Sequence, residues 1–303
     1  DGLGNTAQLN AWLASNGGAV ASDICSNVTW TNNFEALSDL CGNTGAATVI
    51  FTATDDCGNF STTSATFTIV DLTAPVVTCP ENITVNNDQA LCSAYVTVPQ
   101  PGYVEACGTV TIVNSINQTA NASGIYSVGT TNVIWTVTDE CGNVSTCSMS
   151  VTVVDNEAPI ITCPEDVIFC DTEPVILGQA TATDNCGEIA SITNNAPASF
   201  PVGVTYVTWT AVDIHGNSST CVQTVTIVAH PTANAGPDDI ICQANNYTVS
   251  GASATNYSSI LWTHNGQGSL QNANTLTPTY IPQVGETGNI TLTLTVYANA
   301  PCA

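Results

Sequence analysis

The sequence predicts an all-β fold: tandem immunoglobulin-like β-sandwich modules arranged as an elongated rod. Three observations predict it. Of the 303 residues, 44% are hydrophobic and only 8% are charged, a balance that argues against disorder. Alternating strands ending in Asp-x-x-Gly-Asn recur roughly every 75 to 85 residues, which is the signature of a repeat protein. The chain also carries 14 cysteines.

The repeated unit is a strand followed by a turn and a second strand. Val133, Trp135 and Val137 alternate with threonines, so they face one side of a half-buried strand. Asp139 to Asn143 then supplies turn residues, which predicts a hairpin. The same pattern occupies residues 48–59 and 206–217.

One helix is expected near the start of the chain. Thr6 is the expected N-cap, and the helix should run from Ala7 to Ser15 and stop at Asn16-Gly17-Gly18.

Short proline-containing joints follow the hairpins. Asp71-Leu-Thr-Ala-Pro75 and Asp155-Asn-Glu-Ala-Pro159 occupy equivalent positions, and His230-Pro231 opens a different last segment. Because proline cannot donate to a sheet ladder, it marks an edge or a boundary. We expect modules at residues 1–72 (lacking a first strand), 73–156, 157–230 and 231–303, joined semi-rigidly.

Charge excludes whole classes of partner. The chain has 24 acidic residues and no lysine or arginine, giving a formal charge of −24. Nothing can neutralise phosphate, so no nucleic acid is expected as a partner. No run of about 18 apolar residues exists, so no direct membrane insertion is expected.

The cysteines indicate an oxidising compartment, which predicts an extracellular or cell-surface location. The first residues do not form a secretion signal, so we expect a segment of a larger exported protein.

Several motifs carry a family resemblance. Residues 71–147 contain Asp71-x-x-Ala-Pro, Cys79-Pro-Glu, Val128-Gly129-Thr130-Thr131 and Asp139-x-Cys-Gly-Asn, and they resemble the hyalin-repeat (HYR) family. The third module is similar, through Cys163-Pro164 and Asp184-Asn-Cys-Gly187. The first module resembles SprB-like repeats of giant Bacteroidetes-type surface adhesins, and residues 233–253 resemble their PKD-like modules. The resemblance implies spacers and stalks.

Sandwich geometry restricts the disulfides without fixing them. The loop before the third core strand and the terminal hairpin turn lie at one end of such a fold, and its first and last strands run side by side. The expected pairs are Cys107–Cys141, its repeat Cys25–Cys57, Cys79–Cys147, its repeat Cys163–Cys221, and Cys242–Cys302. The third module has His215 at the turn position where the first two modules have cysteine, so Cys186 needs another partner. Cys221 is the main candidate, in competition with its expected pairing to Cys163. Zinc held by cysteine is disfavoured, since no Cys-x-x-Cys pair exists.

Acidic residues gather at the predicted joints, and only metal ions can compensate them in a chain without basic side chains. Calcium binds six to eight oxygens, several of them carboxylates. One interpretation is therefore a calcium site among Asp71, Glu81, Asp139, Asp155, Asn156, Glu157, Glu165, Asp184 and Asp213. The other is that Asp139 and Asp213 bind only their own turns, Asp184 caps a loop, and the remaining acids stay solvated.

No catalytic pattern is present, so we expect no enzyme. The function predicted is a structural stalk or spacer of a long extracellular adhesin or surface filament. One alternative is carbohydrate binding through Trp12, Tyr103, Tyr257 and Trp262, although Trp135, Trp209 and Trp262 fit core positions better. A second alternative is a self-assembling fibre subunit. Expected partners are flanking modules of the same chain, with neighbouring filament chains and surface glycans as alternatives.

Overall fold

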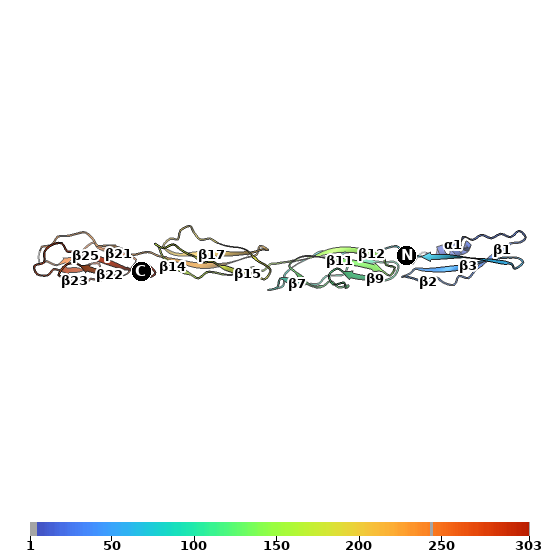
Figure 1. The fold of residues 1–303 in the computed structure, drawn as a ribbon, viewed down its shortest axis with the longest axis horizontal. Helices are drawn as coiled ribbons and strands as arrows, with labels where there is room; N and C mark the ends of the chain where they lie inside the picture. Colours follow the sequence, from blue (N-terminus) through green and yellow to red (C-terminus); the bar gives the residue numbers. More distant parts are fainter. Residues whose placement is uncertain (1–4, 243–244, 303) are drawn as a thin grey trace. The chain divides into compact units, whose positions relative to one another are not determined.

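The computed structural model describes residues 5–242 and 245–302. The chain divides into two compact units, Asp1–Asn156 and Glu157–Ala303, and each is described by itself. Strands dominate both units (Figure 1). None of the described helices combines the length and the hydrophobicity needed to cross a bilayer. We group the strands into four segments: segment 1 contains β1–β4, segment 2 β5–β12, segment 3 β13–β18 and segment 4 β19–β25.

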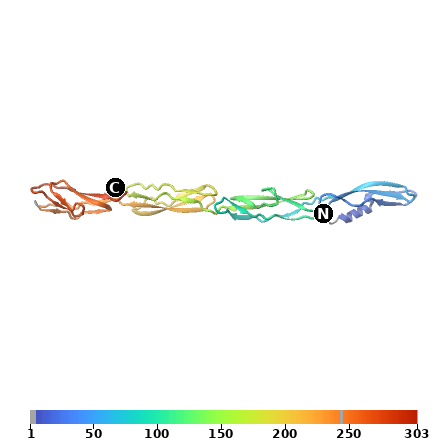
Figure 2. The same ribbon diagram turned by 90° about the horizontal axis from the view of Figure 1, so that it is seen from below.

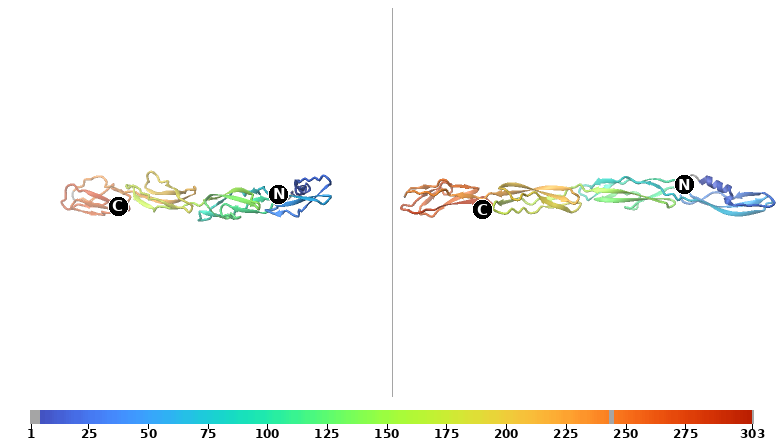
Figure 3. Two further views of the ribbon diagram at one scale, coloured as in Figure 1. Left: turned by 45° about the vertical axis from the view of Figure 1, so that its right-hand side comes forward. Right: turned by 90° about the horizontal axis from the view of Figure 1, so that it is seen from above.

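Segment 1 is one four-stranded sheet covered by a helix. β3 pairs with β4 on one side and with β1 and β2 on the other, and all pairs are antiparallel. The helix α1 lies along one side of these strands (Figures 2 and 3). The elements are α1 (Asn5–Ala14), the 3-10 turn η1 (Asn16–Gly18), β1 (Val28–Asn32), β2 (Ser38–Asp39), β3 (Gly45–Asp55) and β4 (Phe60–Ile69).

The predicted helix is present and packs through its aromatic residue. The Trp12 ring lies 5.4 Å from the rings of both Phe51 and Phe67. Thr6 lies inside the helix, since α1 begins at Asn5. Gly17, inside the following turn η1, has a φ of 64°, and a Cβ there would press on the Phe51 ring. Glycine therefore both permits the turn and lets it approach the sheet.

Segment 2 is a two-layered sandwich. The main sheet has the order β6-β12-β11-β9, with β6 parallel to β12, and two short pairs, β10-β7 and β5-β8, accompany it. Trp135 and Val151 of the main sheet belong to one core with Val96 and Tyr126 of the β10-β7 pair. The strands are β5 (Val76–Thr78), β6 (Ile83–Asn86), β7 (Ser93–Val96), β8 (Gly102–Val104), β9 (Val110–Asn114), β10 (Gly124–Ser127), β11 (Gly129–Asp139) and β12 (Val144–Val154).

Segment 3 repeats this plan. Its main sheet is β14-β18-β17-β16, again with a parallel first pair, and β13 pairs with β15. Trp209 and Val225 belong to its core together with Ala180. The strands are β13 (Ile160–Thr162), β14 (Val167–Cys170), β15 (Thr181–Thr183), β16 (Ile189–Asn194), β17 (Gly203–Asp213) and β18 (Ser218–Val228).

Segment 4 has the pairings β20-β24-β23, β22-β25 and β19-β21. Trp262 and Tyr280 are buried. Its strands are β19 (Thr232–Asn234), β20 (Tyr247–Thr248), β21 (Ser253–Thr255), β22 (Tyr257–His264), β23 (Ser269–Gln271), β24 (Thr279–Ile281) and β25 (Leu292–Ala298).

The three predicted hairpins are confirmed, in β3-β4, β11-β12 and β17-β18. Each turn is held by its first aspartate. In the second hairpin, Asp139 Oδ1 accepts the backbone N–H of Cys141 and of Asn143, both at 2.8 Å. The Asn143 side chain donates to Asp139 Oδ2 at 2.8 Å, so the motif builds a closed turn. The predicted all-β tandem sandwich fold is confirmed; the rod-like arrangement remains a prediction from the sequence.

Candidate functional site

Two disulfides lie within single segments. Cys79 is bonded to Cys147 and Cys163 to Cys221, with Cα–Cα distances of 5.7 and 5.8 Å. These are the pairs expected from the repeat. Cys147 lies opposite Trp135 in the register of its hairpin, and Cys221 lies opposite Trp209. Each bond therefore fastens the last long strand to the start of its segment beside the core.

A third disulfide, Cys41–Cys141, joins segments 1 and 2. Cys41 follows β2 and Cys141 lies in the β11-β12 turn, 100 residues further along, with a Cα–Cα distance of 5.0 Å. That distance is within the usual range for a disulfide. The bond links the sheets of two successive segments covalently.

Three loops converge around the Cys41–Cys141 bond. Glu140 Oε1 accepts hydrogen bonds from the backbone and hydroxyl of Thr109, at 3.3 and 2.5 Å. The hydroxyl bond is the largest cause of the lowered pKa of Glu140. A Cβ on Gly42 would collide with the carbonyl group of Cys107, so the close contact of these loops requires glycine at position 42.

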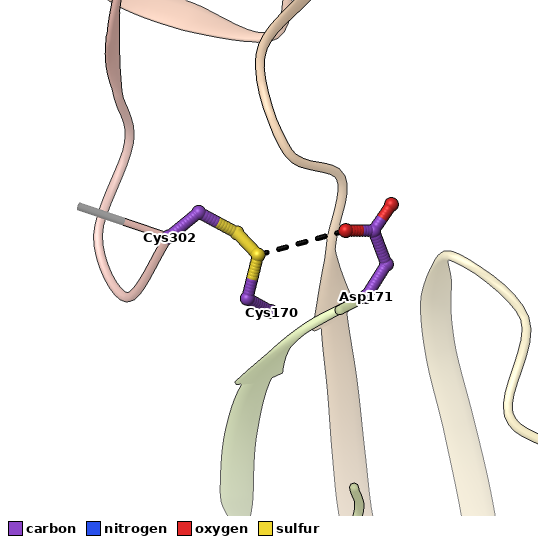
Figure 4. Close-up of side chains that lie close together, drawn as sticks. All are labelled: Cys170, Asp171 and Cys302. Carbon is purple, nitrogen blue, oxygen red and sulfur yellow. Dashed lines mark hydrogen bonds between the residues drawn. A yellow bond between two sulfur atoms is a disulfide. The ribbon is translucent and has the colours of Figure 1, made fainter. Parts of the chain in front are cut away.

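The fourth disulfide, Cys170–Cys302, joins segments 3 and 4 (Figure 4). It spans 132 residues, with a Cα–Cα distance of 5.0 Å. Asp171 Oδ1 lies 3.5 Å from Cys170 Sγ. Because both sulfurs are bonded, neither can serve as a thiolate ligand, and this cluster is not a metal site.

His230 and Asp171 contact one another beside the same joint. His230 Nδ1 lies 2.9 and 3.0 Å from the two Asp171 oxygens, and the His230 backbone N–H donates to Asp171 Oδ1 at 3.1 Å. The side-chain hydrogen bond with His230 is the main cause of the lowered pKa of Asp171.

Three expected disulfide pairings were wrong. Cys141 is bonded to Cys41, so the predicted Cys107–Cys141 bond is absent; the hairpin turn meets the neighbouring segment as well as its own loop. Cys302 is bonded to Cys170, not to Cys242, because the end of segment 4 returns to segment 3. Cys25 and Cys57 are exposed and unbridged; there Asn27 N–H donates to Asp56 Oδ2 at 3.3 Å instead. The rival pairing of Cys186 with Cys221 was also wrong, since Cys221 is bonded to Cys163.

Cys41 and Cys170 were missed as bridging residues. One signal pointed to an inter-module bond: the expected modules 1–72 and 73–156 hold three and five cysteines, and odd numbers leave one in each unpaired within its module. The expected modules 157–230 and 231–303 hold four and two, so no count could reveal Cys170–Cys302.

Asp139 and Asp213 bind their own turns, as the alternative to calcium supposed. Asp213 accepts N–H groups from His215 and Asn217 at 2.8 and 2.9 Å. For both aspartates burial acts to raise the pKa, but the hydrogen bonds from the turn outweigh it and the pKa is lowered. Their oxygens already hold the turn together.

Asp71 differs from these turn residues. It is 6% exposed, and its Oδ1 accepts the Thr73 N–H at 2.9 Å, but its buried Oδ2 accepts no hydrogen bond. Ligand-type atoms of Asp71, Glu105 and Cys107 lie within 4.8 Å of one another. Glu105 was not expected at this joint, and no signal in the sequence singled it out.

The other acidic candidates are scattered. Glu81 and Glu165 are exposed. Asp155 and Asn156 directly follow β12, and the Asn156 N–H donates to Asn87 Oδ1 at 3.1 Å. In the second unit, Glu157 accepts a hydrogen bond from Asn185 at 2.7 Å, and Asp184 accepts the Cys186 N–H at 2.7 Å.

The aromatic candidates for sugar stacking divide into two kinds. Trp262 is 3% exposed and donates to the Thr275 carbonyl at 3.0 Å, and Trp12 packs between α1 and the sheet, so these two rings belong to the interior. Tyr103 and Tyr257 are 49% and 36% exposed. They lie in segments 2 and 4.

Comparison with protein families gives one match. The profile of the HYR domain matches residues 70–153 and 154–227, which together are more than half of the chain.

Two curated relatives are both described as hyalin. The one from Strongylocentrotus purpuratus is 30% identical over 188 residues, covering 58% of this chain and 15% of the relative. The one from Lytechinus variegatus is 29% identical over 171 residues, covering 52% of this chain and 32% of the relative. The matched region is therefore a minor part of each relative's length.

Among solved structures, similar chains include the extracellular cadherin domains 1–5 of Protocadherin Gamma B2, with 13% identity and a TM-score of 0.38 over 84% of this chain and 64% of that one. Domains 1–4 of Protocadherin Gamma B7 cover 99% of this chain and 97% of that one, with 10% identity and a TM-score of 0.35.

Proposed function

The chain belongs to the HYR domain family, and from that premise we propose that it is a non-catalytic structural segment of a long extracellular adhesion-type protein. It serves as a stalk or spacer that holds other parts of the protein away from the cell. The flanking modules of the same longer chain are its first partners.

The observation that carries this proposal is the pair of disulfides between successive segments. Cys41–Cys141 and Cys170–Cys302 each fasten one β-segment to the next. Such bonds add nothing to a catalytic cleft, but they limit bending and separation at a joint. They also persist only in an oxidising environment, which supports an extracellular location.

We propose the modules to be residues 1–72, 73–156, 157–230 and 231–303, the first akin to SprB-like repeats and the last to PKD-like modules. The context is a giant surface adhesin of the Bacteroidetes type. The lack of lysine and arginine suits this role, because parallel anionic stalks repel one another.

Small-angle X-ray scattering of the oxidised protein tests the stalk. Four sandwiches of about 35 to 40 Å in line give a length near 150 Å, hence a radius of gyration of about 43 Å. A single compact globule of this size would give about 19 Å. A value near the smaller figure would contradict the proposal.

We further propose that calcium binds at the joint of segments 1 and 2, through Asp71 and Glu105. A buried carboxylate is costly unless it is compensated, and the chain has no basic side chain to do so. Asp71 Oδ2 lacks a donor, and a carboxylate oxygen of Asp71 lies within 4.8 Å of one of Glu105. Glu105 Oε1 is engaged by the N–H groups of Ala106 and Cys107, at 2.7 and 2.8 Å, which fixes that carboxylate in place.

Calcium titration of the intact protein, followed by calorimetry, checks this site. Asp71→Asn should weaken binding at least tenfold, because it removes the buried charge. Glu81→Gln is the matched control: Glu81 is an exposed acid of segment 2, and its loss should leave affinity unchanged. Equal effects of the two variants, or preference for zinc through Cys107, would reject the calcium site without affecting the stalk.

The remaining partners, surface glycans and neighbouring filament chains, are secondary proposals. Tyr103 and Tyr257 are the exposed candidate rings for sugar stacking, and they lie in different segments. Hits on a glycan array, or light scattering that grows with calcium, would favour glycans or fibre assembly respectively.

A further inference from the structure

We propose that the two inter-segment disulfides form a covalent bypass for tension, so that a pulled chain bears load through a short path and shields most of its β-structure from unfolding. This inference deepens the proposed stalk function. Its physical claim, however, concerns bond connectivity alone.

The bypass follows from the order of the cysteines along the chain. Tension that enters from the N-terminal side reaches Cys41 and crosses the disulfide to Cys141. It then follows the backbone through residues 141–170 and crosses the second disulfide from Cys170 to Cys302. Residues 42–140 and 171–301 lie in closed loops, which a pull on the chain ends cannot straighten while both bonds hold.

Between the two bonds, the backbone that bears the load is short. Residues 141–170 contain β12, β13 and β14, which are already extended strands. At 3.3 to 3.6 Å per residue, the whole stretch spans at most about 100 Å. Tension therefore passes along the covalent backbone of β12. The hydrogen bonds that pair β12 with β6 and β11 need not break.

The shielded loops contain most of the fold. β3 to β11 lie between Cys41 and Cys141, and β15 to β25 lie between Cys170 and Cys302. The cores around Trp135 and Trp209 thus keep most of their strands off the load path.

The two disulfides within segments provide the next covalent shortcut when an inter-segment disulfide is lost. If Cys41–Cys141 is lost, the path runs from Cys41 to Cys79 and crosses to Cys147. If Cys170–Cys302 is lost, the path crosses from Cys163 to Cys221 and continues to the chain end. Each loss should release a length that the sequence positions fix in advance.

Single-molecule pulling of the whole chain between handles at its two ends tests the bypass. Oxidised protein should reach a contour length of at most about 250 Å, including release of the residues before Cys41. After reduction with a phosphine, it should reach about 1,050 Å. An oxidised chain that extends by several hundred ångströms more than the predicted limit, without bond rupture, would overturn the proposal.

Single variants then locate each bypass. Cys41→Ser should lengthen the oxidised chain by about 110 Å, and Cys302→Ser by about 260 Å, at 3.5 Å per residue. Cys25→Ser is the matched control, because Cys25 is exposed and unbridged, and it should change nothing. In situ reduction of the unmodified chain keeps the test valid if a variant folds poorly.

The outcome is separable from that of the stalk proposal. A compact particle in scattering that still shows the short contour length would reject the stalk and keep the bypass. An extended particle whose oxidised chain pulls out to full length would keep the stalk and reject the bypass.

Discussion

Segments 2 and 3 share a hairpin, an aspartate-held turn and a disulfide, yet each is bonded to its neighbour at a different end of its long hairpin. In segment 2 the inter-segment bond starts from Cys141, in the turn. In segment 3 the turn position holds His215, and the bond starts from Cys170, whose strand pairs with the far end of β18 at Val228. The repeat therefore preserves the module, while single residues outside it decide where modules are fastened.

The two cores differ in one polar contact. In segment 3, Trp209 Nε1 donates to the fully buried Gln223 at 3.1 Å, and Gln223 donates to the carbonyls of Glu165 and Leu177, each at 2.7 Å. In segment 2 the position of Gln223 is taken by Met149, and Trp135 Nε1 has no partner. The same fold thus accommodates either a buried hydrogen-bond network or an apolar side chain at this position.

The largest loss of stability should come from removing the disulfide that segments 2 and 3 share. Replacing both cysteines of Cys79–Cys147 by serine should lower the free energy of unfolding by about 2–4 kcal/mol, because the bond closes a long loop. The matching change at Cys163–Cys221 should cost about the same, since its loop is of similar length. Urea unfolding of the oxidised proteins measures both; a cost in one segment only would break the equivalence.

A smaller change in stability should distinguish the core of segment 3 from that of segment 2. Gln223→Met should destabilise by about 1–3 kcal/mol, because it leaves Trp209 Nε1 and two carbonyls without partners. Met149→Gln should change stability by less than about 1 kcal/mol, since a new bond to Trp135 offsets burial of the amide. Thermal unfolding compares them, and equal losses would show that the network in segment 3 has no special role.

The smallest effect concerns acid. The folded pKa values of Asp139 and Asp213 are lowered, so these groups contribute stability above their unfolded pKa, near 3.9, and lose it as pH falls through the folded values. Asp139→Asn should therefore flatten the loss of stability between pH 5 and pH 2, as seen in urea midpoints.

The same change at Asp213 should act alike, because both turns have the same hydrogen bonds. An unchanged pH slope in both variants would show that other groups govern acid unfolding.

Local features of the fold were predictable because neighbouring residues encode them. Alternation of apolar and polar residues predicted the hairpins, and Asp-x-x-Gly-Asn predicted their turns. The tryptophans in alternating strands were rightly placed in the core. The disulfide beside each tryptophan followed from one repeat to the next.

Contacts between segments were not predictable in this way. Cys141 has both the Cys107 loop and the Cys41 loop beside it, and only the packing of two segments decides between them. Glu105 joins Asp71 because two loops meet, and neither loop carries a recognisable calcium motif. Sequence periodicity describes one module at a time, so it is silent about the surfaces where modules meet.

Disulfides fasten segment 1 to segment 2 and segment 3 to segment 4, and a non-reducing peptide map tests this claim most directly. The chain lacks lysine and arginine, so pepsin rather than trypsin should be used. We predict cross-linked peptides that join Cys41 to Cys141 and Cys170 to Cys302. Peptides joining Cys107 to Cys141 and Cys242 to Cys302 would contradict the claim, because every disulfide would then lie within one segment.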